Sequence, residues 1–354
     1  MFGNELINEK NKKKNRLIAI DYLKTISILL VIFTHAISAK FNDRILGPFW
    51  IDMAVPIFMI ISGLTYSLSA KRKDINKFSE WFIWDNLKKK LTRVLIPYAV
   101  IISIEVGAYT IIDPQSFGKL LYKVTTGGWG PGSYYIPILL QLMVIFPLLF
   151  ISFNKYPKST MILAFSIHLA FDIYSNMLPI ETKIYRLLIF RYLAFIMMGI
   201  MLYHYPRKVK KKGKELIVLA ILSGAYIWMC TYYGYKPFIF TKWNSTSLPT
   251  VFWAFGIVVL GFKYLNYIKD NIFINIAKII SKASLHIYLV QMVYFHFDFD
   301  RFGLVFTMMA PIIIGIFFYY IETGKTVNFH FRKELRDKLY PSSPFISYRN
   351  FWQY

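Results

Sequence analysis

Long apolar stretches recur along almost the whole chain, and they constrain its fold more than any other feature of the sequence. A membrane-spanning helix needs about 20 mostly apolar residues, within a range of about 17–25. Ten stretches come close to this length, and they cover residues 17–39, 49–70, 94–112, 133–153, 159–176, 185–204, 215–233, 249–265, 283–297 and 303–323. Hydrophobic residues make up 56% of the chain and charged residues only 17%, whereas about a quarter of a soluble domain is charged. The sequence therefore predicts an all-α fold, a polytopic membrane bundle of about ten transmembrane helices.

The rest of the composition excludes other classes of protein. Aromatic residues make up 19% of the chain, which is too many for a disordered protein. Cys230 is the single cysteine, so an internal disulfide and a cysteine-based metal site are excluded. A formal net charge of +23 would indicate nucleic acid as the partner of a soluble protein. In a membrane protein the charge reports topology instead, and we expect no nucleic acid partner.

The positions of Lys and Arg predict the orientation of the spans. If the N-terminus is cytoplasmic, 31 of the 42 Lys and Arg residues fall in cytoplasmic segments and nine in outer loops. This asymmetry favours cytoplasmic N- and C-termini and anionic membrane lipids as partners. The predicted domains are a basic cytoplasmic N-terminus (1–16), a membrane domain (17–323) and a basic cytoplasmic tail (324–354). We also expect an amphipathic helix over about 268–282 to lie on the membrane before the ninth span.

Ionisable residues at membrane depth are few, and each costs at least about 2.5–3.5 kcal/mol, so they usually face the bundle interior and have a function. They are Asp21, Lys24, His35, Asp52, Glu105, His168, Asp172, Arg191 and His286. Lys24 and His35 share one face of the first span, about 16 Å apart along its axis. This face presents a cation near the cytoplasm and a titratable base in the outer half. The alternative is that Asp21 neutralises Lys24 and that His35 is hydrogen-bonded to a neighbouring backbone.

Asp52 begins the second span near the level of His35. A carboxylate beside an imidazole would orient the ring and stabilise its protonated form. The alternative is an interfacial residue that favours the positive end of its helix. Glu105 is surrounded by apolar residues in the third span and is expected to be neutral or poised for acid–base chemistry.

The other membrane-embedded charges also lie toward the middle or outer side of the predicted bundle. His168 and Asp172 are four residues apart on the fifth span, and Arg191 lies in the sixth. Together with His35, these residues indicate a polar cavity that opens outward. The alternative is pairwise neutralisation, such as Asp172 with Arg191, in a structural bundle. His204, His286 and His296 have no metal-like spacing, so no metal site is predicted.

Two loops carry candidate binding residues. The outer loop over 127–135 is rich in Gly and Pro, and its Trp129 and Tyr135 can stack on a sugar ring. The alternative for these aromatic residues is the interfacial belt found in most membrane proteins. In the basic inner loop over 71–93, Lys90 and Arg93 can bind the phosphates of a cytoplasmic nucleotide-bearing donor. The alternative there is anchoring by the positive-inside rule.

Several of these segments resemble the acyltransferase 3 family of integral membrane acyltransferases. Arg16–Lys24 (RLIAIDYLK) continuing to His35 resembles its opening helix, with a basic residue, ten residues and then His. The other matching segments are Val55–Gly63 (VPIFMIISG), Lys90–Tyr98 (KLTRVLIPY) and Ser284–Gln291 (SLHIYLVQ). Two positions depart from the family pattern. Lys24 replaces the commoner Arg, which makes bidentate phosphate binding less favourable, and Gln291 replaces a frequent His, so Gln291 is given no catalytic role.

The resemblance implies a membrane-bound O-acyltransferase with about ten spans in a bacterial cell membrane. It implies cytoplasmic acetyl-CoA or another acyl-CoA as the donor, with no bound cofactor, and His35 as the catalytic residue. The implied acceptor is a hydroxyl of a cell-surface polysaccharide or a lipid-linked glycan. Within this scheme Lys24, Lys90 and Arg93 are expected to bind the donor, and Trp129, Tyr135 and Arg191 the acceptor. Asp52 and Glu105 are expected to assist His35.

A glycan or lipid-linked sugar transporter or flippase is the main alternative function. Intramembrane His, Asp, Glu and Arg residues suit proton coupling as well as acyl transfer. Against this alternative, the sequence has no two-half symmetry and no paired broken helices. A non-catalytic scaffold in a polysaccharide-synthesis complex is a third possibility.

Overall fold

The computed structural model describes residues 17–178, 181–237, 244–265, 272–297 and 303–324, and all regular structure within them is helical. The ten helices that correspond to the predicted spans are α2 (Ile18–Ala36), α4 (Ala54–Arg72), α6 (Trp84–Ile112), α8 (Tyr135–Lys155), α9 (Pro157–Met177), α11 (Leu193–His204), α13 (Gly213–Tyr232), α14 (Val251–Leu265), α15 (Ile272–His296) and α16 (Leu304–Thr323). Shorter helices connect them, namely α3 (Ala39–Arg44), η1 (Gly47–Phe49), α5 (Phe78–Trp81), α7 (Phe117–Thr125), α10 (Thr182–Leu187), η2 (Ile189–Tyr192), α12 (Pro206–Lys211), η3 (Asn244–Thr246) and η4 (Leu248–Thr250). The predicted all-α polytopic bundle is confirmed.

Eight segments of the described chain are long and apolar enough to cross a membrane. They contain α2, α4, α6, α8, α13, α14, α15 and α16. The other two predicted spans correspond to α9, which has 21 residues, and to α11, which has only 12 and continues from η2. The protein is therefore a multi-pass membrane protein.

Two helices extend beyond the stretches that the sequence predicts. α6 begins at Trp84, ten residues before the predicted apolar span, because the Lys-rich segment there consists largely of good helix formers. α15 runs without a break from Ile272 to His296, so the described part of the predicted surface helix over 268–282 belongs to the ninth span itself. Its first turns pack against α2, where Thr25 Oγ1 donates a hydrogen bond to Ala277 O at 2.9 Å.

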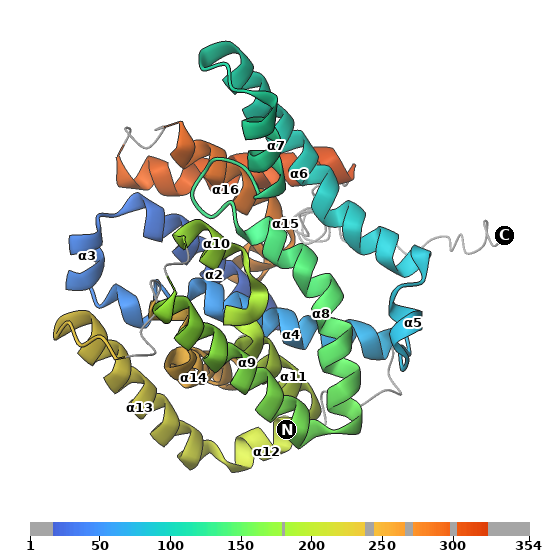
Figure 1. Cartoon of the computed structure of the whole chain (residues 1–354), viewed down its shortest axis with the longest axis vertical. Helices are drawn as coiled ribbons and strands as arrows, with labels where there is room; N and C mark the ends of the chain where they lie inside the picture. Colours follow the sequence, from blue (N-terminus) through green and yellow to red (C-terminus); the bar gives the residue numbers. More distant parts are fainter. Residues whose placement is uncertain (1–16, 179–180, 238–243, 266–271, 298–302, 325–354) are drawn as a thin grey trace, which may run out of the picture.

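The centre of the bundle is built on α4 and α11, which pack against each other (Figure 1). Every residue from Leu193 to Ile200 of α11 is buried, as expected for a helix that is apolar on all sides. Glycines allow the two backbones to approach: a Cβ on Gly63 would lie 3.3 Å from the Cα of Gly199. Small residues at such a contact are typical of membrane helix pairs. α2 and α14 also pack on α4, and α15 packs on α2, α6 and α16.

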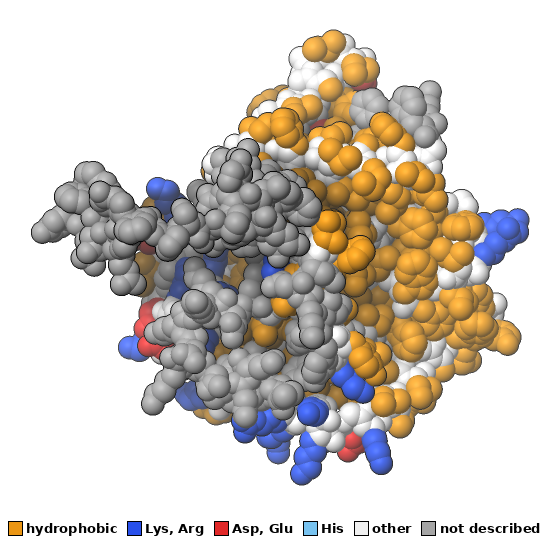
Figure 2. Space-filling model, turned by 180° about the vertical axis from the view of Figure 1, so that it is seen from behind, with side chains coloured by type: hydrophobic (Ala, Val, Ile, Leu, Met, Phe, Trp, Pro, Cys, Tyr) orange, Lys and Arg blue, Asp and Glu red, His pale blue; other side chains and the backbone are white. Residues whose placement is uncertain are grey.

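The short connecting helices lie on the two sides that the charge pattern predicts. α3, α7 and α10 lie in the upper and left part of Figure 1, and α12 and α5, which belongs to the basic loop over 71–93, lie in the lower and right part. Hydrophobic side chains cover much of the described surface, and Lys and Arg side chains gather along its lower edge (Figure 2). An apolar surface of this extent needs a lipid environment. We call the side of α5 and α12 the basic end and the side of α3, α7 and α10 the opposite end.

Candidate active site

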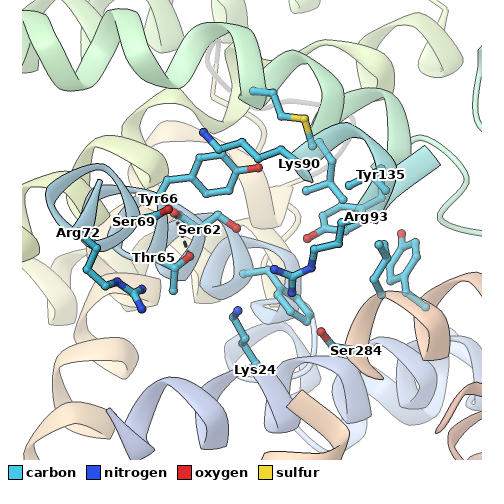
Figure 3. A pocket seen from close by; sticks show the side chains of 16 residues that line it. Lys24, Ser62, Thr65, Tyr66, Ser69, Arg72, Lys90, Arg93, Tyr135 and Ser284 are labelled. Carbon is cyan, nitrogen blue, oxygen red and sulfur yellow. Dashed lines mark hydrogen bonds between the residues drawn. The ribbon is translucent and has the colours of Figure 1, made fainter. Parts of the chain in front are cut away.

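A cavity of about 370 Å³ opens near the basic end, and we call it the basic cavity. Four cations from three helices line it: Lys24 of α2, Arg72 of α4, and Lys90 and Arg93 of α6. The described residues that line it include no Asp or Glu. Lys24 and Arg93 reach into the space from different sides with Ser284 of α15 beside them, and Arg72 lies at one end (Figure 3). Converging cations with no carboxylate among them favour an anionic ligand.

Hydroxyl groups of α4 form one wall of the basic cavity. Ser62, Thr65 and Ser69 line it together with Tyr66 and Arg72, because residues three and four apart share a helix face. Such hydroxyls can donate hydrogen bonds to phosphate or carbonyl oxygens. Sequence reasoning did not select these residues, although the polar stripe within an apolar helix was a readable signal.

The predicted donor-binding residues are brought together, but they are not equivalent. The Lys90 Nζ lies 2.8 Å from the centre of the Trp81 ring and 5.6 Å from that of Tyr66. This aromatic contact holds the ammonium group at one edge of the cavity. Arg93 and Lys24 project further into the space (Figure 3).

A second, smaller cavity of about 50 Å³ contains His35, and we call it the histidine cavity. Asp52 lines it as well, so the structure places the predicted imidazole and carboxylate at one site. The Asp52 carboxylate accepts hydrogen bonds from Asn42 Nδ2, at 3.3 Å to Asp52 Oδ1 and at 3.5 Å to Asp52 Oδ2. The His35 ring lies 5.7 Å from the ring of Phe295 on α15. Other polar residues around this cavity are Thr34, Tyr134, Tyr192, Ser245, Thr246 and Tyr288.

Tyr288 of α15 lines both cavities and so connects them. Its hydroxyl donates to Gly132 O at 2.7 Å, which fixes the ring against the loop before α8. Its ring lies 4.7 Å from that of Tyr135, and Tyr135 lies 6.2 Å from Phe58. These three aromatic residues stand where the basic cavity approaches His35.

The structure places Tyr135 and Trp129 differently from the predicted sugar-binding site. Tyr135 is buried and lines the basic cavity instead of the outer mouth. The reason is that the Gly-rich loop before α8 is itself largely buried and packs on α15, where a Cβ on Gly130 would lie 2.2 Å from Met292 O. Trp129 lines neither described cavity, and its ring stacks on Tyr109 of α6 at 4.7 Å and 17°.

Glu105 lies against the Gly-rich loop and outside both described cavities. The backbone amides of Trp129 and Gly130 face its carboxylate. Gly128 has φ +111°, and a Cβ there would lie 2.6 Å from Glu105 Oε2. Glu105 therefore contacts the Gly-rich loop and does not line the cavity that contains His35.

Arg191 is fully buried behind the histidine cavity. Its guanidinium lies over the rings of Tyr134, Tyr185 and Tyr192, at 4.5–5.2 Å from their centres. Tyr134 and Tyr192 line the cavity, whereas Arg191 does not. Arg191 therefore lies behind the tyrosine side chains of this cavity, and its predicted contact with an acceptor stays a prediction.

His168 and Asp172 hold the segment of η3 and η4. The His168 Nε2 lies 3.0 Å from Thr246 O, and Asp172 Oδ2 accepts from the backbone N–H of Leu248 at 2.8 Å. The two side chains lie 3.7 Å apart and are fully buried. Because Thr246 lines the histidine cavity, this pair shapes it from behind.

The remaining histidines lie in other surroundings. His286 contacts Glu322 of α16 at 3.2 Å, and His204 lies among the rings of Phe150, Phe153 and Tyr203. Within the described residues no group of three or more His, Cys, Asp and Glu side chains could hold a metal ion.

The fold and the two cavities define a multi-pass helical membrane protein in which a cationic cavity lies beside a half-buried histidine. A family model described as an acyltransferase domain, that of the acyltransferase 3 family, matches residues 17–321. The chain belongs to the acyltransferase 3 family, and is in general terms a membrane acyltransferase. No curated protein and no solved structure gives a significant match.

Proposed function

We propose that this protein moves an acetyl or similar short acyl group from cytoplasmic acyl-CoA to a hydroxyl of a cell-surface or lipid-linked polysaccharide in a bacterial cell membrane. The observation that carries the proposal is the pairing of the two cavities, one cationic and one containing His35, on either side of Tyr288. Acyl-CoA has a phosphate-rich head and a long arm that ends in a thioester. The negatively charged phosphates of the head can bind Lys24, Arg72 and Arg93 in the basic cavity. The arm would then extend toward His35.

The chemistry requires a base and an exchange of bonds at the acyl carbon. In the proposed reaction, His35 takes the proton of the acceptor hydroxyl while its oxygen bonds to the thioester carbon. The carbon–sulfur bond breaks, and CoA leaves as a thiolate that takes up the proton from His35. General base catalysis of this kind typically contributes about 10²–10⁴-fold. An acyl-imidazole intermediate on His35 would connect the same reactants and products in two steps.

The first test is a His35→Ala variant in cells that make the glycan. We expect the acyl ester content of the purified surface glycan, measured by NMR, to fall at least about 100-fold. The amount of glycan at the surface should stay the same. His204→Ala is the matched control, because His204 lines neither described cavity.

The alternatives give different results in this experiment. Loss of glycan from the surface with its ester content retained would indicate a transporter or flippase. No change in either quantity would indicate a scaffold and would overturn the proposed function.

A further inference from the structure

Three aromatic side chains in contact with one another, Phe58, Tyr135 and Tyr288, lie where the basic cavity meets the residue shared with the histidine cavity, and we call them the aromatic constriction. Phe58 and Tyr135 line the basic cavity, and Tyr288 lines both cavities. On α4, Val55 lines the histidine cavity and Phe58 the basic cavity, which corresponds to about 4.5 Å of helix rise. The wall is therefore about one side-chain layer thick.

The constriction is held in place from several directions. The hydroxyl of Tyr288 donates to Gly132 O, and a Cβ on Gly132 would lie 3.1 Å from Tyr288 Cζ, so the ring is closely confined. Tyr135 is packed between Phe58 and Tyr288. Both tyrosines are buried. Small rotations of these aromatic side chains can let a narrow group pass between them, whereas a bulky group would have to displace a whole ring.

The space beyond the wall is small. The histidine cavity has a volume of about 50 Å³. For comparison, an apolar protein cavity of about 150 Å³ admits a benzene molecule. An acetyl group is small enough for a space of this size, whereas a butyryl or succinyl group takes up more room than the tyrosine side chains leave.

We propose that the aromatic constriction selects the acyl group, so that acetyl passes to His35 and longer acyl groups are excluded. This inference rests on the proposed function, and it makes Tyr288 and Tyr135 specificity-determining residues. Removing either ring should admit longer acyl groups, because a pocket discriminates each additional methylene by about 10–200-fold.

The first arm of the test measures acyl selectivity. Inside-out membrane vesicles from cells that express the protein carry their own acceptor, and they receive radiolabelled acetyl-CoA or butyryl-CoA. We expect the ratio of butyryl to acetyl incorporated into extracted glycan to rise at least about tenfold in Tyr288→Leu and in Tyr135→Leu. Leu289→Ala is the control, since Leu289 is buried on the same helix and lines neither described cavity. We expect its ratio to match that of the parent protein.

The second arm does not depend on acyl transfer. Cys230 is the single cysteine, so Cys230→Ser gives a thiol-free background into which His35→Cys is introduced. Membrane-impermeant anionic methanethiosulfonates of two sizes are then added from the basic end. In the protein with Cys230→Ser and His35→Cys, we expect the small reagent to react much faster than the large one. Adding Tyr288→Leu should make the large reagent react at least about tenfold faster.

The outcomes separate the two proposals. Unchanged selectivity and unchanged labelling by the large reagent in both tyrosine variants, at normal protein abundance, would overturn the constriction. Labelling that depends on reagent size, together with no acyl transfer by the unmodified protein in the first arm, would overturn the proposed function alone.

Discussion

At the scale of single residues, the site depends on which charged side chains reach a shared space. Lys24, Lys90 and Arg93 were all predicted to bind the donor, and all three line the basic cavity. Lys90 lies over Trp81, whereas Arg93 reaches into the chamber (Figure 3). The planar guanidinium can also bind a phosphate with two hydrogen bonds. Arg93 is therefore the side chain on which donor binding should depend most.

Arg93→Gln is expected to raise the KM for acyl-CoA at least about tenfold with a smaller change in kcat. A hydrogen bond to a charged group contributes about 1.5–3 kcal/mol, and Gln keeps part of the length without the charge. The measurement is the dependence of acyl incorporation on donor concentration in inside-out vesicles.

Lys89→Gln provides the control for this prediction. Lys89 is an exposed cation on the same helix and does not line the basic cavity. An equal rise in KM for both variants would mean that these cations act only through long-range electrostatic attraction of the donor, without direct contact.

At the scale of elements, close helix contacts and backbone hydrogen bonds place the cavities. The Gly63–Gly199 contact brings α4 against α11 and sets the position of the α4 face that carries Ser62 and Thr65. On the opposite side, Glu105 packs against Gly128 of the Gly-rich loop. The carbonyl of Gly132 in the same loop accepts the hydrogen bond of Tyr288. Changes far from His35 can thus alter both cavities.

Gly199→Ala is expected to destabilise the protein. A Cβ at Gly199 would lie 2.8 Å from Leu64 N and 3.0 Å from the Cα of Gly63, so the two helices would have to separate. Overpacking of this kind costs about 1–3 kcal/mol. The measurement is the midpoint of thermal unfolding of the purified protein in detergent.

Gly107→Ala is the matched substitution, because a Cβ at Gly107 meets nothing within 4 Å. Alanine is favoured over glycine within a helix by about 1 kcal/mol, so this variant should unfold at the same temperature or a higher one. If both alanines lowered the midpoint equally, the close approach of α4 and α11 would not be the cause.

At the scale of the whole molecule, the arrangement of charge predicts how the bundle sits in the membrane. The basic end carries α5 and α12, and the opposite end carries α3, α7 and α10 (Figure 1). The proposed function needs the basic cavity to open to the cytoplasm, where acyl-CoA is found. Orientation is therefore a testable requirement of the proposal.

Single cysteines in the Cys230→Ser background test this orientation. Lys77→Cys next to α5 is expected to react with a membrane-impermeant maleimide only in inside-out vesicles. Lys119→Cys on α7 is expected to react in intact cells. Both positions are exposed, so the reverse pattern would contradict the predicted topology and leave the basic cavity on the wrong side for the donor.

The sequence alone predicted much of the molecule at this scale. The apolar stretches predicted the helical membrane bundle, and the short segments around Lys24, His35 and Arg93 predicted the family that the match over residues 17–321 confirms. The clustering of Lys24, Lys90 and Arg93 followed from their helical positions and the expected orientation of the spans. These features are local or periodic, and for that reason they can be derived from the order of residues.

The tertiary structure decided how the site is partitioned. Tyr135 faces the basic cavity, Arg191 lies behind a wall of tyrosines, and Glu105 faces a loop. Tyr288, which the sequence analysis did not select for the site, lines both cavities. Such placements depend on how deep the Gly-rich loop enters the bundle and on how closely α4 approaches α11. Both are set by contacts between segments far apart in the chain, so the periodicity of a single helix carries no information about them.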